Sequence, residues 1–136
     1  MTETLTINGA VPIVPFADPR AGISWLEKAF GAVATMVAPP EPDQPLQHAE
    51  VKVGNGLVMI DDADRTDSPF SLPGPVVVYV VVDDPSNVNA LHDHAVAAGA
   101  EVVMGLTDQD YGSREFAARD PHGNVWCFGT YRPSLG

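Results

Sequence analysis

The chain contains an internal repeat, and this repeat limits the folds open to it more than any other feature. Residues 18–32 begin with Asp-Pro and end with Gly-Ala, and residues 84–100 do the same. In each copy the aspartate is placed to cap a helix, the proline to occupy its first position and the glycine to end it. Apolar side chains recur at helical spacing within both copies. The sequence therefore predicts two equivalent helices, one in each half of the chain.

Segments with strand character flank both predicted helices in the same order. Apolar runs precede and follow each helix, at residues 11–16, 33–37, 76–82 and 101–105. Each half then ends in two further strands around a tight turn, Gly-Asn-Gly at residues 54–56 and Asp-Pro-His-Gly at residues 120–123. The predicted order is therefore β-α-β-β-β, repeated once.

The predicted fold class is α+β, with two tandem βαβββ modules that form a paired, cleft-enclosing mixed sheet. We expect a single domain over residues 1–136, with module 1 at about 9–61, a Pro-rich linker at about 62–75 and module 2 at about 76–131. A module of roughly 60 residues buries too little apolar surface to be secure alone. The two modules are therefore expected to pack side by side, with a cleft between their concave faces.

Composition argues against some partners and some compartments. The chain has 18 acidic and 7 basic residues and a net charge of −11, which repels nucleic-acid phosphates and anionic lipid headgroups. We therefore expect no nucleic-acid and no membrane partner. Cys127 is the single cysteine, so no intrachain disulfide can form, and the first residues carry no signal-peptide pattern. These features predict a cytoplasmic protein.

Six short motifs carry a resemblance to a known family. They are residues 26–32 (LEKAFGA), 48–54 (HAEVKVG), 80–84 (VVVDD), 97–100 (AAGA), 108–114 (DQDYGSR) and 120–126 (DPHGNVW). Together they resemble the vicinal-oxygen-chelate superfamily, in its glyoxalase/bleomycin-resistance-like branch. The resemblance implies the glyoxalase/bleomycin-resistance/dihydroxybiphenyl-dioxygenase-like fold. It also implies a homodimer in which one chain completes the cleft of the other.

The resemblance further implies a metal held by His, Gln or Glu on inward positions of the first and last strands of each half. The matching residues here are Cys127 and Ile60 on the last strands, and Val77 or Tyr79 and Val11 or Ile13 on the first strands. None of them offers an imidazole or a carboxylate, and a divalent metal needs several such ligands converging. We therefore predict neither a metal nor another cofactor.

The candidate residues of the cleft are His48, Glu50, Tyr79, Tyr111, Arg114 and Cys127. His48 and Glu50 share one face of a strand, which suits either a hydrogen-bonded pair or two ligands of a metal that lacks a third. Tyr79 interrupts a run of valines, either as a core residue or as a hydroxyl in the cavity.

Two further candidates also have two interpretations. Arg114, in the Tyr-Gly-Ser-Arg segment that begins at Tyr111, either binds an anionic group at the cavity mouth or pairs with a nearby carboxylate. Cys127 is either a nucleophile or a buried inert thiol, and a nucleophile needs a neighbour that lowers its pKa. The sequence near Cys127 supplies no such neighbour.

The sequence supports three hypotheses about function, each of a different class. The favoured hypothesis is a protein without a metal or a catalytic activity that binds a small hydrophobic or aromatic molecule in its cleft, as in drug sequestration. The alternatives are a metal-dependent lyase, isomerase or dioxygenase of the same superfamily, and a structural or regulatory module without a small ligand. Catalytic residues are not identifiable from the sequence.

Overall fold

The repeat indicates correctly where the two helices begin. Helix α1 spans Pro19–Phe30 and helix α2 spans Pro85–Ala97, each with proline at its first position. The carboxylates of Asp18 and Asp84 accept hydrogen bonds from backbone amides of the first turns, as helix caps do. Helix α1 ends at Gly31, whose φ of 68° lies in the left-handed region that favours glycine.

The computed structural model describes residues 10–67, 69 and 72–133. Its strands are β1 (Ile13–Phe16), β2 (Val33–Ala38), β3 (His48–Val53), β4 (Gly56–Asp62), β5 (Val77–Val81), β6 (Glu101–Asp108), β7 (Arg114–Arg119) and β8 (Val125–Gly129). With α1 after β1 and α2 after β5, the chain forms two βαβββ modules. The predicted fold class is thereby confirmed.

Each module forms one four-stranded mixed sheet. The first sheet has the strand order β1-β4-β3-β2 and the second sheet has the equivalent order β5-β8-β7-β6. Strands β1 and β4 run parallel, as do β5 and β8, whereas the other neighbours are antiparallel. The first strand of each module is therefore an edge strand that lies next to the last strand.

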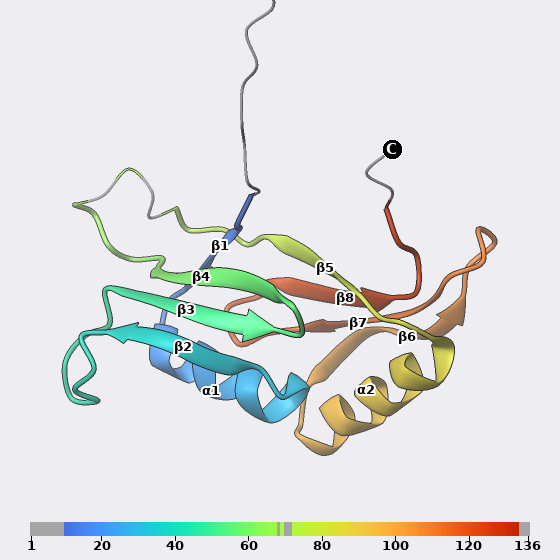
Figure 1. Cartoon of the computed structure of the whole chain (residues 1–136). Coiled ribbons are helices and arrows are strands. Elements are labelled where there is room, and N and C mark those ends of the chain that lie inside the picture. The colour runs from blue at the N-terminus through green and yellow to red at the C-terminus, as the bar shows by residue number, and fades with distance from the viewer. Residues whose placement is uncertain (1–9, 68, 70–71, 134–136) are drawn as a thin grey trace, which may run out of the picture.

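The two modules share one hydrophobic core. Helices α1 and α2 lie beside one another on the same side of the two sheets (Figure 1). The core joins Val14 and Ile60 of the first module to Trp126 and Phe128 of the second. Phe30, at the end of α1, brings its ring centroid within 4.3 Å of the Phe128 ring. Because burying such a side chain stabilises a fold by roughly 1.5–3 kcal/mol, the modules stabilise each other.

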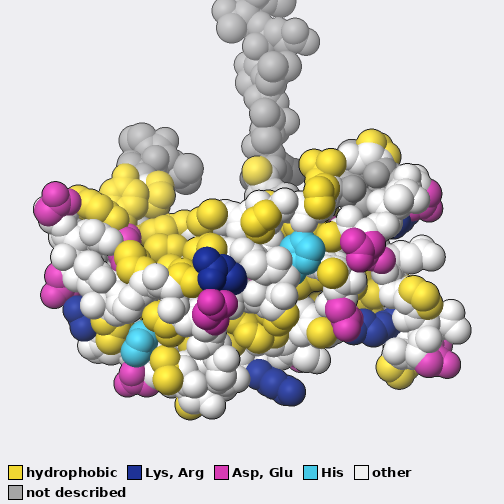
Figure 2. Space-filling model, turned by 180° about the vertical axis from the view of Figure 1, so that it is seen from behind, with side chains coloured by type: hydrophobic (Ala, Val, Ile, Leu, Met, Phe, Trp, Pro, Cys, Tyr) yellow, Lys and Arg dark blue, Asp and Glu magenta, His cyan; other side chains and the backbone are white. Residues whose placement is uncertain are grey.

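The sheet faces turned away from the helices stay partly exposed and apolar. Val77 of β5 is 73% exposed, Val33 of β2 56% and Ile13 of β1 41%. Hydrophobic side chains also spread across the middle of the molecule seen from behind (Figure 2). We call the sheet faces that are turned away from the helices the outer faces of the two sheets. None of the helices that the described residues form is long and apolar enough to cross a membrane.

Candidate functional site

The outer face of the second sheet gathers side chains from three neighbouring strands. Tyr79 of β5 lies opposite Cys127 of β8, which lies opposite Ala117 of β7, so their side chains share one face. Glu115 is two residues before Ala117 on the same strand and points to the same face. It pairs with Gly129, where an added Cβ would lie 2.7 Å from Glu115 Cγ. Gly129 therefore leaves the space that Glu115 occupies.

Glu115 is the centre of this face. The residue is only 4% exposed, and its two carboxylate oxygens accept four hydrogen bonds. Tyr111 Oη donates to Oε1 at 2.9 Å, and Gln109 Nε2 donates to the same oxygen at 3.3 Å. Ser113 Oγ and Tyr79 Oη donate to Oε2 at 3.0 and 3.3 Å. All four donors are neutral groups.

Three tyrosines and Glu115 line a hollow of about 380 Å³. We call it the tyrosine hollow; its lining residues are Tyr79, Tyr111, Glu115 and Tyr131. The Tyr131 ring meets the other two edge to face, with centroids 6.5 Å from Tyr79 and 6.1 Å from Tyr111. The Tyr131 backbone amide donates to Ser113 Oγ at 2.9 Å, which ties the segment after β8 to the residue that precedes β7.

The surroundings keep the hydroxyls of Tyr79 and Tyr111 and the thiol of Cys127 protonated at neutral pH. Burial raises the pKa of Tyr79, and the hydrogen bond to Glu115 raises the pKa of Tyr111 to about 12. Burial, with the negative charge of Glu115, raises the pKa of the Cys127 thiol to about 11. Because a nucleophilic cysteine needs a lowered pKa, the surroundings of Cys127 favour an inert thiol.

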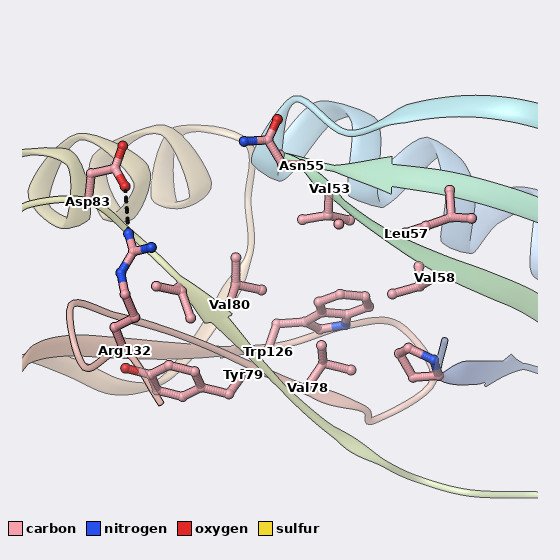
Figure 3. Close-up of a pocket in the computed structure, with 14 residues that line it drawn as sticks. Val53, Asn55, Leu57, Val58, Val78, Tyr79, Val80, Asp83, Trp126 and Arg132 are labelled. Carbon is pink, nitrogen blue, oxygen red and sulfur yellow. Dashed lines mark hydrogen bonds and ion pairs between the residues drawn. The ribbon is translucent and has the colours of Figure 1, made fainter. Parts of the chain in front are cut away.

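A second pocket lies at the seam between the modules. It has a volume of about 470 Å³, and we call it the seam pocket. Its lining consists of Pro12, residues 53–58, residues 78–81, Asp83, Trp126 and Arg132. Figure 3 shows valines of β5 and of the β3–β4 hairpin on its two sides, with the Trp126 indole between them. At one end Arg132 Nη2 contacts Asp83 Oδ1 at 3.1 Å. Tyr79 lines both this pocket and the tyrosine hollow, so the two adjoin across β5.

The structure brings together three of the six residues predicted from the sequence. Tyr79, Tyr111 and Cys127 surround Glu115, whose role the sequence reasoning missed. The available signal was a glutamate inside a strand that continues as Phe-Ala-Ala, because glutamate is depleted in strands unless a specific contact holds it.

The other three predicted residues lie elsewhere. Arg114 Nε donates to Asn89 Oδ1 of α2 at 2.7 Å, and its Nη1 contacts Asp108 Oδ1 at 3.0 Å. Arg114 therefore ties β7 to the helix side and to a carboxylate. His48 Nε2 lies 3.2 Å from Glu50 Oε2 on β3 of the first module, where the two form a pair.

One residue of the expected metal-ligand set lies on the other face of its strand. Ile60 is fully buried towards the helices, and its neighbour Met59, which pairs with Ile13, occupies the outer face instead. The corresponding pair in the second module is Tyr79 and Cys127. One aliphatic side chain, one thioether, one phenol and one thiol do not fit a divalent ion that prefers imidazole and carboxylate. Across residues 10–67, 69 and 72–133, no three His, Cys, Asp or Glu side chains cluster to hold a metal.

Comparisons with known proteins agree with this architecture. The chain is 34% identical to an uncharacterized protein of Mycobacterium tuberculosis over 137 residues, which cover 93% of this chain and 78% of that protein. An uncharacterized protein of Mycobacterium bovis is 35% identical over 119 residues, covering 82% and 76%.

Solved structures resemble the whole fold. The crystal structure of TioX from Micromonospora sp. ML1 is 26% identical with a TM-score of 0.69 and covers 95% of this chain and 100% of its own. A lactoylglutathione lyase from Agrobacterium tumefaciens is 20% identical with a TM-score of 0.72, covering 91% and 94%. The family model for the glyoxalase/bleomycin resistance protein/dioxygenase superfamily matches residues 9–128. With the βαβββ repeat, these matches show that the chain belongs to the glyoxalase/bleomycin resistance protein/dioxygenase superfamily.

Proposed function

We propose that this chain is a metal-free binding protein that holds a small apolar or aromatic molecule on its second module. The observation that carries the proposal is the tyrosine hollow over Glu115, which adjoins the seam pocket at Tyr79. Ligand sites are typically concave and apolar, with a few fixed polar groups that orient the ligand. Leu57 and the valines of β5 in the seam pocket supply the apolar surface, and Glu115 with its hydroxyl partners supplies the polar anchor.

The side chains of the site favour binding over catalysis. The positions that hold a metal in metal-dependent relatives carry Ile13, Met59, Tyr79 and Cys127, which suit no hard divalent ion. The Cys127 thiol stays protonated at neutral pH, because burial and the charge of Glu115 raise its pKa to about 11. Sequestration of a drug-like compound is the use of such a site that we favour. The single cysteine supports a cytoplasmic location, and the net charge of −11 argues against nucleic-acid or membrane partners.

The apolar outer faces also support a homodimer. Val77, Ile13 and Val33 leave a large part of their surface in water in a single chain. Apolar surface of this kind gains free energy when a second copy covers it. A partner that lies on these faces would also cover the mouth of the tyrosine hollow, which opens on the same side as Tyr79.

A ligand screen with metal analysis tests this function. Protein purified without chelator is screened by thermal shift against neutral, anionic and cationic aromatic compounds, and the same preparation is analysed for Zn, Ni, Mn and Fe. A ligand at a hundred times its Kd stabilises the fold by about 2.7 kcal/mol, which shifts Tm by several degrees. We expect such shifts with no stoichiometric metal, and we expect Tyr79→Ala to reduce them. A stoichiometric transition metal, or a library without any binder, contradicts the proposal.

A further inference from the structure

The buried carboxylate of Glu115 has hydrogen-bond donors but no positive partner among the residues that the structure describes. Its four donors are two phenols, one hydroxyl and one amide. Among the ion pairs of the described residues, none includes Glu115. Hydrogen bonds satisfy the oxygens, yet a negative charge out of water is still attracted strongly to a cation nearby. The electrostatics of the tyrosine hollow therefore favour a positive ligand group and disfavour an anionic one.

The walls of the hollow suit the same kind of group. The Tyr131 ring lies at 76° to the Tyr79 ring and at 86° to the Tyr111 ring, so it stacks flat on neither of them. Rings set at such angles border a space from different directions. The π-face of an aromatic ring attracts an ammonium group within about 6 Å, and aromatic cages for alkylated ammonium ions are built on this attraction.

The size and donor set of the hollow favour an organic cation over a metal ion. A calcium ion takes six to eight oxygen ligands at short distance, and the hollow offers one carboxylate whose oxygens already accept four hydrogen bonds. A space of about 380 Å³ instead accommodates an alkylated ammonium group with part of its substituents. The net charge of −11 adds a long-range field that attracts cations to this surface.

We propose that the tyrosine hollow binds a protonated amine or quaternary ammonium group of the ligand, with Glu115 as its counterion and the three tyrosine rings as its walls. This inference rests on the proposed function, because the seam pocket beside Tyr79 receives the apolar remainder of the same ligand. It adds the chemical class of the ligand: a cationic compound that carries an apolar or aromatic body.

The test compares two probes of the same shape. Choline carries a trimethylammonium group, and 3,3-dimethylbutan-1-ol replaces it with a neutral tert-butyl group. Both are titrated at low ionic strength into the full chain, followed by NMR signals of the tyrosine rings. We expect choline to bind at least about tenfold more tightly than the alcohol, because only the cation gains from Glu115 and the rings. The expected shifts are largest at Tyr79, Tyr111 and Tyr131.

Matched variants locate the effect. Glu115→Gln removes the counterion and keeps the shape of the side chain, and Tyr131→Ala removes one wall at a residue that is 51% exposed. Each is expected to weaken choline binding about fivefold or more. Glu27→Gln, on an exposed position of α1, makes the same change in net charge and is expected to leave binding unchanged. If Glu115→Gln fails to fold, Tyr131→Ala still tests the cage.

The outcomes separate this inference from the proposed function. Equal binding of choline and the alcohol, or binding that neither Glu115→Gln nor Tyr131→Ala weakens, overturns the cation site. Absence of choline binding while neutral aromatic compounds still raise Tm overturns the cation site and leaves the binding function standing. If no compound of either kind binds, both proposals fall.

Discussion

Cys127 provides a test of the electrostatics around Glu115 that needs no ligand. Burial and the Glu115 charge raise the pKa of the thiol to about 11, so only about one molecule in a thousand carries a thiolate at pH 8. We expect iodoacetamide to alkylate native Cys127 slowly at pH 8 and about tenfold faster for each pH unit up to about pH 10, with the rate levelling off above the pKa. Glu115→Gln removes one cause of the raised pKa and is expected to increase the rate at pH 8.

Mass spectrometry of the intact protein gives these rates directly. The urea-unfolded chain serves as the control, since its single cysteine is free of burial and of the folded charge of Glu115. Rapid alkylation of the native protein at pH 7 would show an activated thiol and would revive the nucleophile hypothesis for Cys127.

The candidate site was only partly predictable from the sequence, and the missing residues have physical causes. The family resemblance was enough to suggest Tyr79 and Cys127, because both match positions of metal ligands and Tyr79 also interrupts a run of valines. Glu115 was not evident, because its four donors include Gln109, Tyr111 and Ser113, which only the folded β6–β7 loop brings to it. Linear spacing does not show such a loop closure.

At the scale of the elements, the repeat predicts the order of strands and helices but not the register of β4. Strand β8 starts at Val125, two residues after Gly123, whereas β4 starts at Gly56 itself. Cys127 and Ile60, which match each other in the repeat because each lies four residues after a turn glycine, therefore differ in position: Cys127 is on the outer face and Ile60 is in the core. Because a shift of one residue moves a side chain to the opposite face of a strand, Met59 replaces Ile60 on the outer face.

Asn124 links elements of both modules and gives a prediction at this scale. Its buried amide donates to the Pro15 carbonyl of β1 at 2.8 Å and to Asp120 at 2.9 Å, and its Oδ1 accepts from the Val76 amide at 3.0 Å. We expect Asn124→Ala to lower the free energy of unfolding by about 3 kcal/mol, because it leaves buried backbone groups of both modules unpaired.

Urea denaturation followed by tryptophan fluorescence measures this loss. The matched control is Asn55→Ala in the exposed β3–β4 turn, where we expect a change within about 0.5 kcal/mol. A loss below 1 kcal/mol for Asn124→Ala would mean that water replaces the amide and that other contacts join the modules.

For the whole molecule, the helix side and the outer faces have opposite roles. The helix side joins both modules in one core through Phe30 and Phe128. The outer faces keep Val77, Ile13 and Val33 exposed in a single chain. If a second copy covers them, assembly and ligand binding use adjoining surfaces, since Tyr79 lies on the same strand as Val77 and shares its face.

This arrangement predicts which substitution dissociates the proposed homodimer. Light scattering is expected to give twice the 14.4 kDa mass of one chain for the unmodified protein and 14.4 kDa for Val77→Lys, which buries a charge in the interface. Val96→Lys makes the same change at a half-exposed position of α2 and is expected to remain dimeric. An unmodified protein of 14.4 kDa would refute the dimer. If Val96→Lys dissociates while Val77→Lys does not, the copies meet through their helices, and the outer faces with the tyrosine hollow stay open to ligand in both copies.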